Sequence, residues 1–153
     1  MTKFQWDIDL ASLSVEGIKI YLEDFRLGKI EPHLKSEPIP EEQGPLTVLV
    51  GKNWENIVKD ETKDVLVKYY APWCGHCKAL APTWDALAED VKDIDDLVIA
   101  KFDATANEVP GLEIRGYPTL KYYPKNNKAG VDYSGEREIE DFKKYLSENS
   151  SAY

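Results

Sequence analysis

Cysteine and histidine are both scarce in this sequence of 153 residues, which contains two of each. The cysteines are Cys74 and Cys77, and a disulfide between them would close a loop too short to stabilise a domain much through chain entropy. A zinc site requires four protein ligands, or three and a water molecule. Only His76 and the distant His33 could add to the cysteines. The sequence therefore disfavours both a structural disulfide and a metal site.

Long hydrophobic runs and an excess of basic residues are missing as well. No apolar stretch approaches the roughly 20 residues that a helix needs to cross a bilayer. The opening residues, MTKFQWDIDL, are acidic where a secretory signal has an apolar segment. The net charge is -9, whereas nucleic-acid binding requires clustered Lys and Arg. We therefore expect no signal peptide, no membrane association and no nucleic-acid partner.

The apolar pattern divides the chain into parts. Residues 13–27 carry apolar side chains at helical spacing, Gly28 follows as a stop signal, and nothing nearby in sequence covers the apolar face. The next residues are rich in Pro, Glu and Lys without periodicity, as in an extended linker. We predict a helix remnant of a preceding domain (1–28), a linker (29–45), a complete domain (46–150) and a tail (151–153).

The complete domain alternates strand and helix patterns. Strands are expected at 46–51, 64–71, 97–103, 119–124 and 130–135, and helices at 53–62, 75–92, 107–113 (a single turn) and 138–149. Pro82 lies inside the second helix and predicts a kink. This order indicates an α/β fold with a mixed central sheet and helices on both faces.

The two cysteines occur in the motif CGHC, which begins where a predicted strand gives way to a predicted helix. A helix N-terminus favours the thiolate, the nucleophilic form of cysteine, and a protonated His76 would add to this effect. We therefore expect Cys74 to be an exposed attacking thiol with a lowered pKa. Cys77, one turn later, is expected to be a buried resolving thiol with a higher pKa. Gly75 would leave the face beside Cys74 open to a polypeptide.

Three stretches, YYAPWCGHCKALAPTW, IAKFDATANEVPGLEIRGYPTLKYYP and YSGEREIEDFKKYL, resemble the protein disulfide isomerase family, in particular its C-terminal catalytic (a-prime) domain. The resemblance implies a thioredoxin fold over about 46–149. It also implies that the residues before it are the end of the b-prime domain and the following linker.

The resemblance assigns roles to single residues. Cys74 would attack the substrate disulfide and Cys77 would release the product. Pro118 would follow a cis peptide bond beside the site, although a turn proline is the simpler alternative. Arg137 would lower the pKa of Cys77, or be an ordinary solvated arginine. A structural role is expected for the competing Arg115.

Two aromatic residues are candidates for substrate binding. Trp73 precedes the nucleophile and is expected to pack beside it, and Tyr117 precedes Pro118. Together they would form an apolar patch for unfolded chains, or else belong to the core.

Lys68 departs from the family pattern. Many members carry a buried Glu six residues before the first cysteine, where it relays a proton to or from the second cysteine. The family's partner lysine matches Lys101, so two lysines replace an opposite-charge pair. Lys68 could be neutral and accept a proton itself, reach Asp103 on the same strand face, or extend its charge out to solvent.

The function implied is that of a thiol–disulfide oxidoreductase and isomerase, which forms, reduces and rearranges disulfides in the endoplasmic reticulum lumen. Its expected partners are unfolded or misfolded secretory polypeptides, with glutathione and an upstream thiol oxidase as redox partners and no bound cofactor. The alternative is a chaperone-like module that binds unfolded polypeptides and whose thiols are incidental.

Overall fold

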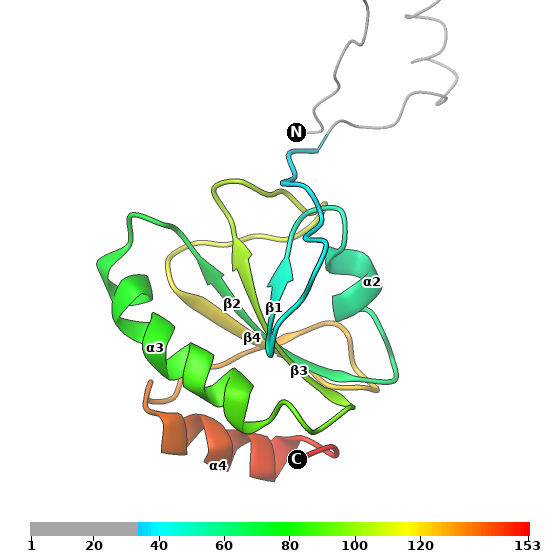
Figure 1. Ribbon diagram of the computed structural model, residues 1–153, viewed down its shortest axis with the longest axis vertical. Coiled ribbons are helices and arrows are strands. Elements are labelled where there is room, and N and C mark those ends of the chain that lie inside the picture. The colour runs from blue at the N-terminus through cyan, green and yellow to red at the C-terminus, as the bar shows by residue number, and fades with distance from the viewer. Residues whose placement is uncertain (1–33) are drawn as a thin grey trace, which may run out of the picture. The chain divides into compact units, whose positions relative to one another are not determined.

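A computed structural model of the chain describes residues 34–153, of which 35–153 form one compact unit (Figure 1). The predicted helix at 13–27 lies outside the described residues. The described elements, in chain order, are β1 (Leu46–Leu49), α2 (Trp54–Val58), β2 (Asp64–Tyr70), α3 (Gly75–Asp90), β3 (Leu97–Asp103), β4 (Thr119–Tyr123), β5 (Val131–Asp132) and α4 (Ile139–Asn149).

The five strands form one mixed sheet in the order β1-β3-β2-β4-β5. The pairs β1–β3 and β2–β3 are parallel, and β4 and β5 continue the sheet in antiparallel fashion. Because β2 has partners on both sides and helices above and below, six of its seven residues are buried. The mixed sheet predicted from the sequence is confirmed.

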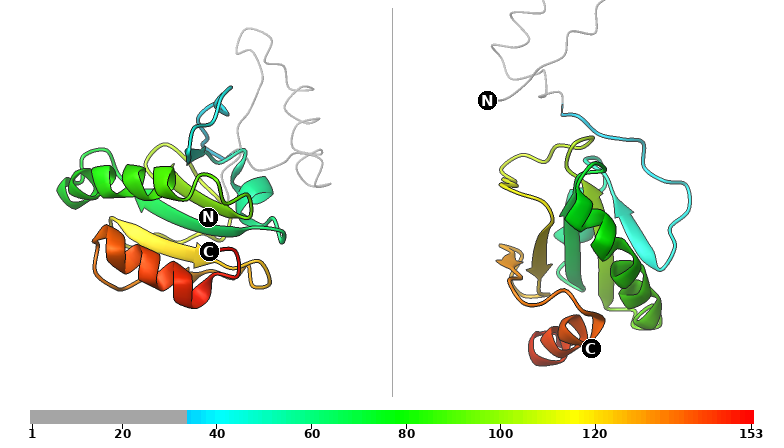
Figure 2. Two further views of the ribbon diagram at one scale, coloured as in Figure 1. Left: turned by 60° about the horizontal axis from the view of Figure 1, so that its bottom comes forward. Right: turned by 90° about the vertical axis from the view of Figure 1, so that its left-hand side faces the viewer.

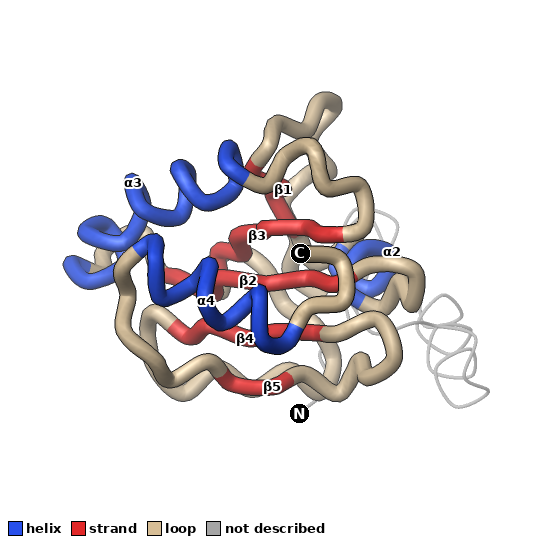
Figure 3. Tube along the Cα trace, turned by 90° about the horizontal axis from the view of Figure 1, so that it is seen from below, coloured by secondary structure: helices blue, strands red, loops and turns tan. Residues whose placement is uncertain are grey.

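Alternation along the strands sends side chains into two cores. Leu66 and Ile99 face the layer of α3 and α4, where they pack with Trp84 and Phe142. The residues of β2 on either side of Leu66 face the opposite side of the sheet and pack against α2. Figures 2 and 3 show α3 and α4 together on one face of the sheet and α2 on the opposite face.

Helix α3 carries the CGHC motif at its first turn and continues through Pro82 to Asp90. Its buried stripe contains Leu80, Trp84 and Leu87, which recur at helical spacing as the sequence predicted. Trp84 also donates its indole N–H to the carbonyl oxygen of Ala100 on β3, at 2.9 Å. The helix is thereby fastened to the middle of the sheet.

Two predicted elements differ in the structure. The helical turn expected at 107–113 is absent, because Asn107 turns its side chain to distant backbone groups and Gly111 adopts a positive φ of 77°. The strand expected at 130–135 is reduced to Val131–Asp132. Past it, Tyr133 still donates its backbone N–H to the carbonyl oxygen of Leu120 on β4, at 2.8 Å, while its ring packs against Phe142 and Tyr145 on α4.

Residues 35–45 were predicted as linker but belong to the compact unit. The Gln43 side chain pairs with the free edge of β1, accepting from the N–H of Val48 and donating to its carbonyl oxygen, both at 2.9 Å. At the start of the segment, Lys35 lies against Gly51. A Cβ added at Gly51 would be 3.0 Å from the carbonyl oxygen of Lys35. This segment is the blue to cyan trace that leads into β1 in Figure 2.

Across the described part of the chain, no helix combines the length and the apolar character that crossing a membrane requires.

Candidate active site

The CGHC motif occupies the junction between β2 and α3. The chain leaves β2 at Tyr70, and the amide of Cys74 donates to the carbonyl oxygen of Ala71 at 3.1 Å. Cys74 then caps α3, with its Sγ accepting a hydrogen bond from the backbone N–H of Cys77 at 3.2 Å. The sulfur therefore sits where the unpaired N–H groups and the positive end of the helix dipole meet.

This position lowers the pKa of Cys74 below the ordinary thiol value. The main cause is a hydrogen bond from the thiol of Cys77, followed by the backbone N–H groups of Cys77 and His76 and by the positive charge of Arg137. Partial burial opposes these effects without cancelling them. Each favourable contact stabilises the negatively charged sulfur more than the neutral thiol.

Cys77 responds in the opposite direction, since burial raises its pKa and its hydrogen bond to Cys74 raises it further. The amide hydrogen bond at Ala71 and the positive charge of Lys68 partly oppose this rise. Both cysteines are free thiols. The pair is thus divided into a thiolate-prone first cysteine and a proton-retaining second one, as predicted.

The expected contrast in exposure is much weaker. Cys74 is 7% exposed and Cys77 is 3% exposed, so the attacking thiol is more buried than we expected. Ala71 and Tyr117 pack around the pair. Hydrogen bonding at the helix terminus is therefore the main cause of the lowered pKa of Cys74, whereas burial is the main cause of the raised pKa of Cys77.

Gly75 and His76 are both exposed between the cysteines. A Cβ added at Gly75 would meet no atom within 4 Å, so the open face does not depend on glycine there. His76 contributes its backbone N–H to the Cys74 sulfur.

The aromatic residues lie at the rim of the site. Trp73 is 70% exposed and makes an edge-to-face contact with Tyr117, with ring centroids 5.6 Å apart. Trp73 is therefore a surface residue and not part of the core. The peptide bond between Tyr117 and Pro118 is cis, as the resemblance implied.

Both arginines considered for the site, Arg115 and Arg137, are exposed. Arg137 precedes α4, and its charge acts on Cys74. Its expected influence on Cys77 stays a prediction, because the cation that lowers the pKa of Cys77 is Lys68. Arg115 has a side chain that is 90% exposed and pairs with Glu113 at 3.2 Å. Such an exposed pair contributes little to stability.

Lys68 lies in the middle of β2 and is only 3% exposed. Its ammonium lies 5.6 Å from the ring centroid of Tyr70 and 5.9 Å from that of Trp84. Lys101 stands opposite it on β3. Burial lowers the pKa of Lys68, and the charge of Lys101 lowers it further.

A carboxylate that could not be identified from the sequence partly offsets this lowering of the Lys68 pKa. Asp85 on α3 raises the pKa of Lys68. Asp103, which we had considered as its partner, instead accepts hydrogen bonds from the backbone N–H and hydroxyl of Thr105. The available signal was the spacing of Asp85 on α3, two steps of four residues after Cys77.

A small cavity of about 160 Å³ joins these groups. It is lined by Lys68 and Lys101 from the sheet and by Cys77, Lys78 and Asp85 from α3. The candidate proton-relay residues therefore share a space with the second cysteine.

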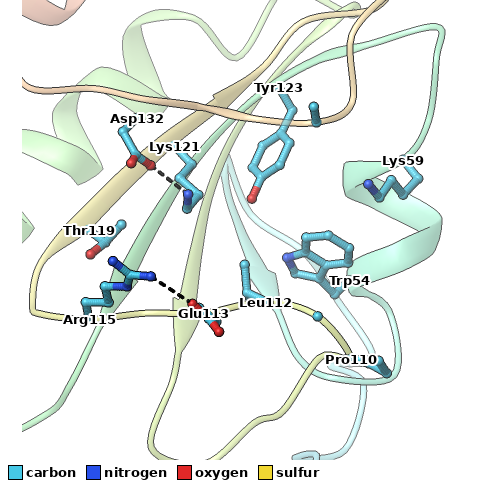
Figure 4. A pocket seen from close by; sticks show the side chains of 12 residues that line it. Trp54, Lys59, Pro110, Leu112, Glu113, Arg115, Thr119, Lys121, Tyr123 and Asp132 are labelled. Atoms are coloured by element: carbon cyan, nitrogen blue, oxygen red, sulfur yellow. Dashed lines mark hydrogen bonds and ion pairs between the residues drawn. The ribbon is translucent and has the colours of Figure 1, made fainter.

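A larger cavity lies elsewhere, on the α2 face of the sheet (Figure 4). It has a volume of about 510 Å³, with Trp54 and Tyr123 among its walls and the ion pair of Lys121 and Asp132 at one side. Neither cysteine lines it. Within residues 34–153, no group of three or more His, Cys, Asp or Glu side chains is placed to hold a metal ion.

Comparison with known proteins finds protein disulfide-isomerases among the similar sequences. The chain is 54% identical to the protein disulfide-isomerase of Humicola insolens and 49% identical to that of Oryctolagus cuniculus. These matches cover 96% and 95% of this chain but only 30% and 29% of those proteins. The chain therefore spans less than a third of the length of these relatives.

A solved structure and a family model agree with these relatives. The first thioredoxin domain of mouse protein disulfide-isomerase A4 matches with a TM-score of 0.59 and 36% identity, over 73% of this chain and 81% of that one. The thioredoxin family model matches residues 45–148. The predicted thioredoxin fold is confirmed, and with its thiol pair at the start of α3 the chain belongs to the thioredoxin family.

Proposed function

We propose that this domain is a thiol–disulfide oxidoreductase and isomerase of the protein disulfide isomerase type. The observation that carries the proposal is the placement of two free thiols at the start of α3, where the Cys74 sulfur accepts the backbone N–H of Cys77 at 3.2 Å. This placement agrees with a pKa that is lowered at Cys74 and raised at Cys77. A low-pKa thiolate attacks a substrate disulfide, and a protonated neighbour one turn away does not compete with it. Residues 1–28 are proposed to be the end of a preceding domain.

The direction of transfer follows from which state the protein stabilises. Hydrogen bonds to the Cys74 thiolate stabilise the reduced protein, which makes its disulfide a stronger oxidant. Oxidation of substrate dithiols to disulfides is then favourable, and a free Cys74 thiolate also allows incorrect disulfides to be reopened. Glutathione or a thiol oxidase would restore the starting redox state.

The substrates proposed are unfolded or misfolded secretory polypeptides in the lumen of the endoplasmic reticulum. The exposed ring of Trp73 and the half-buried ring of Tyr117 supply aromatic surface at the rim of the site, suited to the apolar side chains that unfolded chains present. The polypeptide backbone would lie along the loop that contains Pro118.

The test compares three forms of the domain in insulin reduction and in reactivation of scrambled ribonuclease. Cys74→Ser should abolish both activities, whereas Cys77→Ser should accumulate mixed disulfides with substrate. Unchanged turnover in Cys74→Ser would refute the proposal. Lys78→Ser changes an exposed neighbour on α3 and serves as the control, with both activities retained.

A purely binding role is separated by alkylating both thiols. A chaperone-like module would still suppress aggregation of an unfolded protein after alkylation, while thiol exchange would stop. If the alkylated and unmodified domains reactivated scrambled ribonuclease equally well, the thiols would be incidental.

A further inference from the structure

The buried thiol of Cys77 must lose a proton during each cycle, yet Cys77 is only 3% exposed. In the step that releases the substrate, Cys77 attacks the sulfur of Cys74 in the mixed disulfide. The thiolate is the attacking form. A group that accepts the proton beside Cys77 is therefore needed when the chain releases its product.

The cavity beside Cys77 contains one group suited to this task. Lys68 is itself 3% exposed and lines the same cavity as Cys77. Its burial and the facing Lys101 disfavour the charged form, and these effects outweigh the attraction of its ammonium to the rings of Tyr70 and Trp84. A buried lysine of this kind is a competent general base, since its neutral amine is populated closer to neutral pH.

Asp85 completes the arrangement at the solvent side. It lines the same cavity but is exposed, so protons can pass between the cavity and bulk water beside it. Its carboxylate favours the ammonium form of Lys68, whereas Lys101 disfavours that form. The cavity volume of about 160 Å³ leaves room for water between the groups.

We infer that Lys68 is the general base for Cys77 and that Asp85 is a positioning residue that sets its charge and connects it to solvent. The inference deepens the proposed function and rests on it. Lys68 takes over a task that a carboxylate performs in the resembling proteins, and the carboxylate is displaced from β2 to α3.

The step balances as follows. The neutral amine of Lys68 takes the proton from the thiol of Cys77, and the resulting thiolate attacks the sulfur of Cys74. A bond forms between Cys77 and Cys74 while the bond from Cys74 to the substrate sulfur breaks. The substrate sulfur leaves as a thiolate with the electron pair and is protonated by water. The substrate is reduced, the protein dithiol is oxidised, and Lys68 returns its proton to solvent past Asp85.

The charged and titratable groups facing Lys68 come from three elements. Tyr70 lies on its own strand and Lys101 on β3, whereas Cys77, Lys78 and Asp85 belong to α3. On the other side of β2 its partner in β4 is Leu120, which does not titrate. The balance of these groups decides the pH at which Lys68 becomes neutral.

The test follows the two thiols separately, by stopped-flow reaction of the reduced domain with the aromatic disulfide 5,5′-dithiobis(2-nitrobenzoic acid). Attack by Cys74 releases the first coloured thiol, and attack by Cys77 on the mixed disulfide releases the second. Cys77→Ser, which lacks the second phase, assigns the two phases.

Lys68→Met should slow the second phase at pH 7 by about a hundredfold, the lower end of general-base effects, with the first phase changed less than about twofold. Lys144→Met removes an exposed cation on α4, away from this cavity, and should leave both phases within about twofold. Lys68→Glu, which restores a proton acceptor, should recover the second phase relative to Lys68→Met. Asp85→Asn should move the pH midpoint of the second phase downward, because Lys68 loses the charge that favours its ammonium form.

An unchanged second phase in Lys68→Met, or equal slowing in Lys144→Met, would overturn the inference. Failure of the wild-type domain to show the first phase would instead refute the proposed function. Circular dichroism of Lys68→Met establishes that it is folded, which is expected because the change removes a buried cation.

Discussion

The contact that holds residues 35–37 against the domain depends on Asn107, whose side chain is 3% exposed. Its oxygen accepts from the backbone N–H groups of Glu37 at 2.8 Å and Gly51 at 3.0 Å. Its amide donates to the Glu37 carboxylate at 2.8 Å and to the carbonyl oxygen of Asp103 at 3.0 Å. One side chain therefore joins three parts of the chain that lie up to 70 residues apart.

Replacing Asn107 with Ala removes three hydrogen bonds to the backbone: it leaves the N–H groups of Glu37 and Gly51 without their acceptor, and it leaves the carbonyl oxygen of Asp103 with only the N–H of Ala106. At about 1 kcal/mol for each net hydrogen bond, the free energy of unfolding should fall by about 3 kcal/mol. Urea unfolding at pH 7 measures this. Hydrogen exchange should also accelerate at the amides of Glu37 and Gly51.

Asn127→Ala is the matched control, because Asn127 is exposed and accepts one local hydrogen bond from the N–H of Ala129 at 3.2 Å. It should change the free energy of unfolding by less than about 0.5 kcal/mol. If Asn107→Ala lost no more stability than this control, residues 35–37 would not be held by the contacts described.

Three further outcomes follow from the structure. Burial lowers the pKa of Lys68, so the unfolded chain binds more protons than the folded one between that lowered value and about 10.4. The free energy of unfolding of the wild type should therefore rise with pH across this window relative to that of Lys68→Met. If urea unfolding at pH 7 and pH 9.5 gave the same change in this free energy for both proteins, the expectation would be wrong. Trp73→Ala should alter stability by less than about 0.5 kcal/mol because the ring is exposed, yet slow reaction with a disulfide-bonded polypeptide more than with glutathione disulfide; equal slowing would remove Trp73 from substrate binding. Tyr69→Phe deletes a hydroxyl that accepts the indole N–H of Trp54 and pairs with the hydroxyl of Tyr123. The free energy of unfolding, measured in thermal or urea melts, should therefore fall by about 1–3 kcal/mol.

Elements governed by local periodicity were predictable from the sequence. The stripe that includes Leu80, Trp84 and Leu87 identified the second helix of the domain, and the run LVIAKFD gave the bounds of β3. The helix expected at 53–62 exists but spans only Trp54–Val58. Its extension would have required periodic burial past Val58, where the chain instead turns toward β2.

Features set by distant contacts could not be read from local pattern. The composition of residues 35–45 is that of a linker, and only the side chain of Asn107, far along the chain, shows why the first part of this segment is held in place. The same amide explains why residues 107–113 do not form a helical turn.

At the site, the sequence identified the thiol pair and the direction of each pKa shift but not the surroundings of Lys68. Its charge depends on Asp85, which lies on a different element and comes close only through the packing of α3 on the sheet. The exposure of Cys74 was also overestimated, because the packing of Ala71 and Tyr117 around the thiols depends on tertiary structure.

The division of the thiol pair is tested most directly by measuring the ionisation of each cysteine in the reduced domain. The absorbance of the thiolate near 240 nm, followed against pH together with the alkylation rate, reports both groups. We predict that Cys74 ionises below the ordinary thiol value and Cys77 above it, and that Cys77→Ala raises the pKa of Cys74 because its main hydrogen-bond donor is lost. If Cys74 ionised at or above the ordinary value, or if Cys77 ionised first, the assignment of Cys74 as the attacking thiol and Cys77 as the resolving thiol would be wrong.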